Sequence, residues 1–160
     1  MEGPIGTMNW EDIAARVGRD FGASPWRTIT QPMIDAFAGV TDDHYFLHVD
    51  PLRAAQPPFT GTIAHGFFTL SLLAPMAYAV CPFVAEARFP LNYGFDRVRF
   101  VAPVPVGSRL RGRFVLRAAD VIGPQQRQTT YEATVEIEGA DRPALVARWL
   151  TRYVMQQAGV

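Results

Sequence analysis

An uncharged segment of 20 residues, Gly66 to Ala85, constrains the fold of this chain more than any other feature. Its length is enough to span a bilayer, but Pro75 and Pro82 interrupt it and several polar residues dilute it. A helix that is apolar on all sides is also typical of the centre of a globular core. We therefore expect a buried central helix that begins near Gly66, and no membrane span.

The sequence after this segment alternates polar and apolar residues with a period of two, which indicates β-strands. The expected strands cover residues 91–101, 108–117, 129–138 and 144–154. Consecutive strands joined by short turns pair antiparallel and expose one apolar face, and the uncharged helix can cover that face. The pattern predicts an α+β hot-dog fold, in which an antiparallel β-sheet wraps around a long central apolar helix.

The 160 residues fit one domain, so we expect a single hot-dog domain over residues 1–160. Residues 1–25 read as an N-terminal extension with a short helix over residues 9–17. Further along, the pattern predicts a short strand at 26–30 and a helix from Gln31 to Ala38, which Gly39 ends. Asp50 is expected to cap one helical turn that begins at Pro51.

The composition excludes several classes of function. The formal net charge is zero, which argues against a nucleic-acid binder. There is no lysine, so lysine Schiff bases and P-loop phosphate binding are excluded. Cys81 is the only cysteine, so no internal disulfide and no cysteine-based zinc site can form. The N-terminus shows no signal-peptide pattern, and we expect a cytoplasmic protein.

Two short motifs carry residues suited to proton transfer. Asp43 precedes His48 by five residues, and the tetrapeptide Ile63–Gly66 stands just before the uncharged segment. Histidine exchanges protons near neutral pH, and a carboxylate can orient water or relay its proton. Each residue also has an ordinary structural explanation: Asp43 as a turn former, His48 as a loop residue bonded to backbone, and Gly66 as the start of a helix.

These motifs resemble those of the MaoC-like (R)-specific enoyl-CoA hydratases and 3-hydroxyacyl-thioester dehydratases, and within them the NodN-like branch. The resemblance rests on three stretches in the same order: Asp43 to Asp50, Ile63 to Leu70, and Asn92 to Phe100 followed by Pro103 to Gly107. It covers most of the chain from about residue 27 onward. Three spaced motifs in one order are more specific than any one of them.

The resemblance implies reversible hydration of 2-enoyl thioesters by Asp43 and His48, with the Gly66 N–H donating to the thioester oxygen. It further implies no cofactor, a coenzyme A or acyl carrier protein thioester as substrate, and a homodimer. Tyr45 and Phe46 replace the Asn-Pro common in the family, and we expect them to reshape the acyl pocket. Some apolar residues behind Gly66 are expected to border the acyl tail: Phe67, Phe68, Leu70, Leu72 and Leu73. Two alternatives remain open, namely a hot-dog acyl-CoA thioesterase and a non-catalytic acyl-thioester binding module.

Other polar residues carry weaker expectations. His44 is expected to face solvent, and His65 to fix the start of the helix rather than to pack beside the pocket. The histidines and carboxylates are scattered in the sequence, so we expect no metal site. Ser71 and Cys81 are expected in the core. Four arginines on alternating strand positions can serve either as phosphate contacts or as a solvated face: Arg97, Arg99, Arg109 and Arg111.

Overall fold

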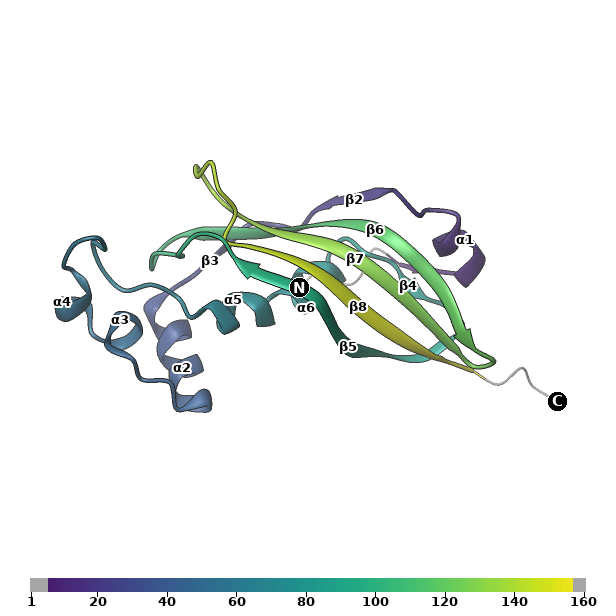
Figure 1. Cartoon of the computed structure of the whole chain (residues 1–160), viewed down its shortest axis with the longest axis horizontal. Coiled ribbons are helices and arrows are strands. Elements are labelled where there is room, and N and C mark those ends of the chain that lie inside the picture. Colours follow the sequence, from purple (N-terminus) through teal and green to yellow (C-terminus); the bar gives the residue numbers. More distant parts are fainter. Residues whose placement is uncertain (1–5, 157–160) are drawn as a thin grey trace.

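The computed structural model describes residues 6–156, in which short helices precede and accompany a large curved sheet (Figure 1). The helices are α1 (Trp10–Ala14), α2 (Gln31–Thr41), α3 (Phe46–Val49), α4 (Pro51–Ala54), α5 (Gly66–Ser71) and α6 (Leu73–Tyr78). The strands are β1 (Thr7–Met8), β2 (Asp20–Ala23), β3 (Arg27–Thr28), β4 (Phe83–Val84), β5 (Ala87–Phe100), β6 (Arg109–Gly123), β7 (Gln126–Ile137) and β8 (Leu145–Met155).

The long strands form one antiparallel sheet in the order β2-β6-β7-β8-β5, with β3 also paired to β6. In Figure 1 the sheet curves over α5 and α6, while α2, α3 and α4 gather beyond one end of it. An antiparallel sheet curved around a central helix is the hot-dog architecture. The fold class predicted from the sequence is therefore confirmed. No helix within residues 6–156 is both long and apolar enough to cross a membrane.

The core fills the space between the concave face of the sheet and the central helices. Cross-strand neighbours Leu116, Tyr131 and Trp149 occupy one row of this face, and all three are buried. Gly112 on β6 lets α6 approach closely, because a Cβ at this position would lie 3.0 Å from the Cβ of Met76. The alternation that predicted the strands thus reflects burial of one face of the sheet.

The prediction of one long central helix was wrong in its extent. The helix is interrupted at Leu72 and ends at Tyr78. Pro75 explains the interruption: it has no N–H to donate to the carbonyl of Ser71, and its ring crowds that carbonyl. Within the first turn of a new helix, α6, proline is tolerated. Residues 83–84, near the end of the uncharged segment, form β4 and pair in parallel with β1.

The N-terminal half also differs from expectation at two points. Helix α2 does not stop at Gly39 but runs to Thr41, where Asp42 adopts a left-handed conformation with φ of 60°. Aspartate tolerates this conformation better than most residues, so the helix needs no glycine to end. Residues 20–23, expected in the N-terminal extension, form β2 and add a strand to the edge of the sheet at β6.

Candidate active site

The segment that carries the first motif is fixed against its surroundings by hydrogen bonds. Asp50 caps α4 as predicted and accepts a hydrogen bond of 3.1 Å from the Arg53 N–H. The Gln31 side chain, at the start of α2, donates to the His48 carbonyl over 2.8 Å and accepts from the Thr62 hydroxyl. These contacts hold the backbone of α3, so the side chains of the motif have defined positions.

His48 has one ring nitrogen engaged with the backbone. Its Nδ1 lies 2.8 Å from the Ile63 carbonyl oxygen. A carbonyl only accepts hydrogen bonds, so Nδ1 carries the proton and Nε2 of the neutral ring keeps a free lone pair. His48 thus makes the hydrogen bond to backbone that was named as its ordinary structural explanation. The same bond leaves Nε2 able to act as a base.

His65 lies beside His48 and is a site residue that the sequence prediction placed wrongly. Its side chain makes no capping hydrogen bond to the helix that follows. Instead, Nε2 donates to the Asp43 carbonyl over 2.9 Å, and the ring stacks on His48 with centroids 3.7 Å apart. The residue is 2% exposed, and its Nδ1 has no hydrogen-bond partner in the described part of the chain. His65 therefore packs beside the candidate pair and fixes the backbone of Asp43.

The structure gathers Asp43, His48 and His65, whose candidate ligand atoms lie within 4.8 Å of one another. Three residues that are separated in the sequence are thus brought together in the structure. A metal ion binds in the plane of an imidazole ring at about 2.0–2.1 Å. The two stacked rings lie 3.7 Å apart and only 26° from parallel, so their lone pairs do not converge on one ion. The arrangement fits proton transfer better than metal binding.

The neighbouring polar residues point to solvent. The Asp42 side chain is fully exposed and lies 3.7 Å from His44, which is itself more than half exposed. Within residues 6–156, neither side chain belongs to the cluster of Asp43 and the two buried or half-buried histidines. Asp43 rather than Asp42 is therefore the carboxylate that accompanies His48.

Gly66 is the first residue of α5, so its N–H has no partner within the helix. A Cβ added to Gly66 would lie 3.1 Å from the ring of Phe100, which sits at the end of β5. Glycine thus permits β5 to approach the start of the central helix closely. Because α5 has only six residues, its helix dipole can stabilise a negative charge only weakly. The free Gly66 amide is the group that can donate a hydrogen bond to such a charge.

Tyr45 and Phe46 stand shortly before His48 in the chain and pack against each other. Tyr45 is 56% exposed, and its ring centroid lies 6.4 Å from that of His48. The Phe46 ring packs 4.8 Å from Tyr45 and lies under the Arg53 guanidinium, 4.4 Å from its centre. Neither aromatic ring borders the two cavities beside α5 and α6.

Two adjoining cavities follow the central helix away from Gly66. The outer cavity is bordered by Phe67, Leu70, Ser71 and Leu73 from the helix. The inner cavity lies between Ala74–Cys81 and strands β5, β7 and β8. Ala74, Asn92 and Trp149 border both cavities. Of the five apolar residues expected near an acyl tail, Phe67, Leu70 and Leu73 line the outer cavity, and Phe68 and Leu72 lie in the core.

The remaining candidates have structural roles. Burial raises the pKa of the Cys81 thiol to about 12, which keeps it protonated and non-nucleophilic. The Ser71 hydroxyl donates to the Phe68 carbonyl over 2.7 Å. Arg109 and Arg111 pair with Glu138 and Glu136 at 2.7 and 2.6 Å, so these two arginines follow the solvated-face alternative.

Fold and site define a hot-dog protein in which an aspartate and two histidines cluster beside the start of the central helix, where a backbone amide is free. Two cavities follow that helix. Residues 12–137 match the family model described as MaoC like domain. The chain is 54% identical over 145 residues to Nodulation protein N of Rhizobium leguminosarum bv. viciae, with 90% of each chain covered. It is 47% identical over 143 residues to 3-hydroxyacyl-thioester dehydratase Z of Mycobacterium tuberculosis, covering 89% of this chain and 94% of the relative.

The fold is also similar to that of a solved structure described as monoamine oxidase regulatory protein from Archaeoglobus fulgius. The TM-score is 0.79 at 22% identity, and the match covers 97% of this chain and 99% of the other. The chain belongs to the MaoC-like dehydratase family, and the resemblance noted in its sequence is confirmed. Membership of this family supports a hydratase or dehydratase activity, that is, a hydro-lyase.

Proposed function

We propose that this protein catalyses the reversible hydration of 2-enoyl thioesters to (R)-3-hydroxyacyl thioesters. The observation that carries the proposal is the cluster of Asp43, His48 and His65, whose candidate ligand atoms lie within 4.8 Å of one another. In this cluster His48 keeps a free Nε2 lone pair, and His65 directly precedes Gly66, whose amide has no partner within α5. A relative that shares 47% of its residues bears the name 3-hydroxyacyl-thioester dehydratase Z, which supports this class of substrate.

In the proposed reaction, His48 Nε2 takes a proton from a water molecule that Asp43 orients. The resulting hydroxide equivalent forms a bond to C3 of the enoyl chain, and the electrons of the double bond move onto the thioester oxygen as an enolate. The Gly66 N–H donates to this oxygen and stabilises its growing charge. The protonated His48 then returns the proton to C2, so that the net change is addition of one water.

The acyl tail is proposed to follow the two cavities along α5 and α6. The first of them begins at Phe67, the residue after Gly66. Its walls are mostly apolar, and the outer cavity has a volume of about 190 Å³. A thioester carbonyl held at Gly66 can therefore direct its tail between the helix and the sheet, where apolar burial stabilises it.

We further propose that the protein acts as a homodimer joined at β5. This strand lies at the end of the sheet order and pairs only with β8 within residues 6–156. It exposes large apolar side chains, including Leu91 at 49% and Tyr93 at 54%. An unprotected apolar edge invites pairing with another strand, and a second copy of β5 can supply it.

The test is an assay of the purified protein with trans-2-enoyl-CoA substrates of graded chain length. The account predicts loss of the enoyl double bond, no release of free thiol, and a 3-hydroxyacyl product of the R configuration by chiral analysis. Free thiol released from acyl-CoA would instead support the thioesterase. Binding of crotonyl-CoA without turnover would support the non-catalytic module.

A further inference from the structure

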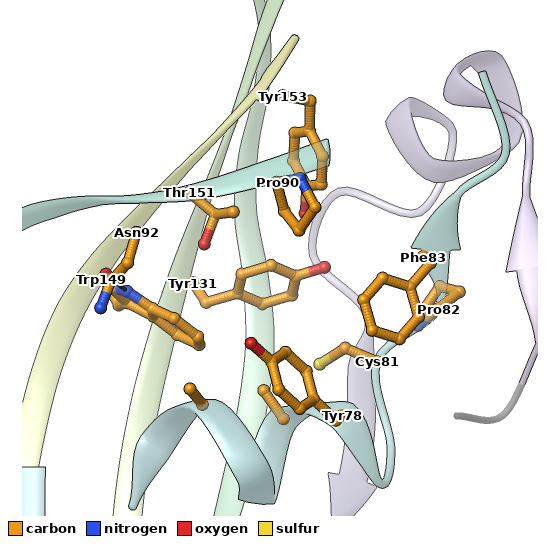
Figure 2. Close-up of a pocket in the computed structure, with 12 residues that line it drawn as sticks. Tyr78, Cys81, Pro82, Phe83, Pro90, Asn92, Tyr131, Trp149, Thr151 and Tyr153 are labelled. Atoms are coloured by element: carbon orange, nitrogen blue, oxygen red, sulfur yellow. Dashed lines mark hydrogen bonds between the residues drawn. The ribbon is translucent and has the colours of Figure 1, made fainter. Parts of the chain in front are cut away.

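The inner cavity contains polar groups that the proposed hydration does not use. Tyr78 from α6, Tyr131 from β7 and Thr151 from β8 border the same space, with the Cys81 thiol beside them (Figure 2). The Tyr153 hydroxyl already pairs with Thr129 at 3.3 Å. The hydroxyls of Tyr78 and Thr151 take part in none of the side-chain hydrogen bonds found within residues 6–156. A cavity built only for an alkyl chain has no need of these groups.

These groups are neutral hydrogen-bond donors. Burial raises the pKa of the Tyr131 hydroxyl and of the Cys81 thiol well above the physiological range. The Tyr131 hydroxyl lies near the Cys81 sulfur, which is a weak acceptor. Both tyrosine and threonine hydroxyls can therefore donate to an oxygen atom that enters the cavity.

The lining also defines which chemical group the cavity accepts. None of the residues that border it carries a charge, so a carboxylate at the end of the chain would be buried without a counter-ion. A methyl end would instead leave the hydroxyls of the buried Tyr131 and Thr151 without a partner, at the cost of their desolvation. This cost does not apply to Tyr78, which is 49% exposed. A hydroxyl or keto oxygen satisfies the donors and needs no counter-ion.

The distance along the helix gives the position of that oxygen on the substrate. The inner cavity begins at Ala74, eight residues after Gly66, which corresponds to about 12 Å of helix. An extended acyl chain covers this distance in about ten carbons. The cavity volume is about 70 Å³, about half that of a cavity of roughly 150 Å³ that holds benzene in another protein. The space therefore fits the end of a linear chain rather than a ring.

We infer that the inner cavity selects 2-enoyl thioesters whose linear acyl chain carries a neutral oxygen, hydroxyl or keto, about ten carbons from the thioester. Tyr131 and Thr151 are the residues that determine this specificity. The inference rests on the proposed function, because it places the reacting double bond beside His48 and Gly66.

The experiment compares trans-2-dodecenoyl-CoA with the same chain hydroxylated at carbon 8, 10 or 12. We expect the wild-type kcat/KM to be highest for a hydroxyl at carbon 10 or 12, by about 3- to 10-fold over the unsubstituted chain, the usual effect of one hydrogen bond. Tyr131→Phe and Thr151→Val should each lower the ratio of kcat/KM for the hydroxylated chain to kcat/KM for the unsubstituted chain. Thr134→Val, on the outer face of β7, is the matched control and should leave the ratio unchanged.

Crotonyl-CoA, whose chain is too short to reach the inner cavity, separates this inference from the proposed function. A wild-type protein that hydrates crotonyl-CoA but treats all dodecenoyl substrates alike refutes the inference alone. A ratio that survives both substitutions also refutes it. If no enoyl-CoA is hydrated, the proposed function fails, and competition between dodecanoyl-CoA and its 10-hydroxy derivative for binding then decides the inference.

Discussion

Replacing Gly66 by proline removes a single backbone N–H, the one proposed to stabilise the enolate. The position tolerates proline in two respects. It is the first residue of α5, where proline is common, and the preceding His65 already has the extended conformation, φ −60° and ψ 140°, that a following proline requires. We expect turnover to fall by about 10²–10³, or about 2.7–4 kcal/mol of transition-state stabilisation, as for loss of one oxyanion donor.

The matched control is Gly66→Ala. Both substitutions add a Cβ that would lie 3.1 Å from the Phe100 ring, so both require the same small shift of that ring, but only proline lacks the N–H. Steady-state hydration of crotonyl-CoA by both variants gives kcat and KM, and circular dichroism confirms that each is folded. The loss should lie mainly in kcat, because charge on the thioester oxygen grows towards the transition state. A folded proline variant as active as the alanine variant would refute the role of this amide.

Three further predictions concern residues around the site and at the edge of the sheet. His65→Leu should lower kcat by about 10- to 100-fold with little change in KM, as expected for a residue that orients others. His65→Gln should recover part of this loss of kcat. Equal effects on kcat and KM would contradict the positioning role. Leu91→Arg should shift the protein towards monomer in sedimentation equilibrium, whereas Val121→Arg, the same change at a more exposed residue on β6, should not. A monomeric wild type at micromolar concentration would disprove the dimer. Because burial raises the pKa of Cys81 to about 12, alkylation at pH 8 should be slow in the native protein and fast in denaturant, and rapid native labelling would show that the inner cavity is open.

The sheet could be predicted from the sequence because one of its faces is buried. On β6, buried residues alternate strictly with more exposed ones from Arg109 to Leu116. Two of the more exposed positions, Arg109 and Arg111, form ion pairs with Glu138 and Glu136. The extent of the central helix could not be predicted from its lack of charge, since apolarity reports burial and not conformation. Pro75 held the missing information: proline at the fourth residue after Ser71 ends one helix and begins the next.

Asp43 and His48 could be predicted as a pair because they stand only five positions apart in the sequence, Asp43 just before α3 and His48 within it. The place of His65 could not, since it depends on a hydrogen bond to the carbonyl of Asp43, a residue 22 positions away. Its position next to Gly66 in the second motif was the only signal, and a residue before a helix has an ordinary capping role. The inner cavity was equally hidden, because its hydroxyls come from Tyr78, Tyr131 and Thr151 on three separate elements.

The central claim is that His48 performs the proton transfers on a water molecule that Asp43 orients. The most direct measurement is the turnover of crotonyl-CoA by Asp43→Asn and His48→Ala, compared with Asp42→Asn, whose side chain is fully exposed beside the site. The account predicts that each of the first two variants is slower than the wild type by about 10²–10⁴, the scale of a positioned acid or base, and that Asp42→Asn is nearly as active as the wild type. An inactive Asp42 variant together with an active Asp43 variant would contradict it.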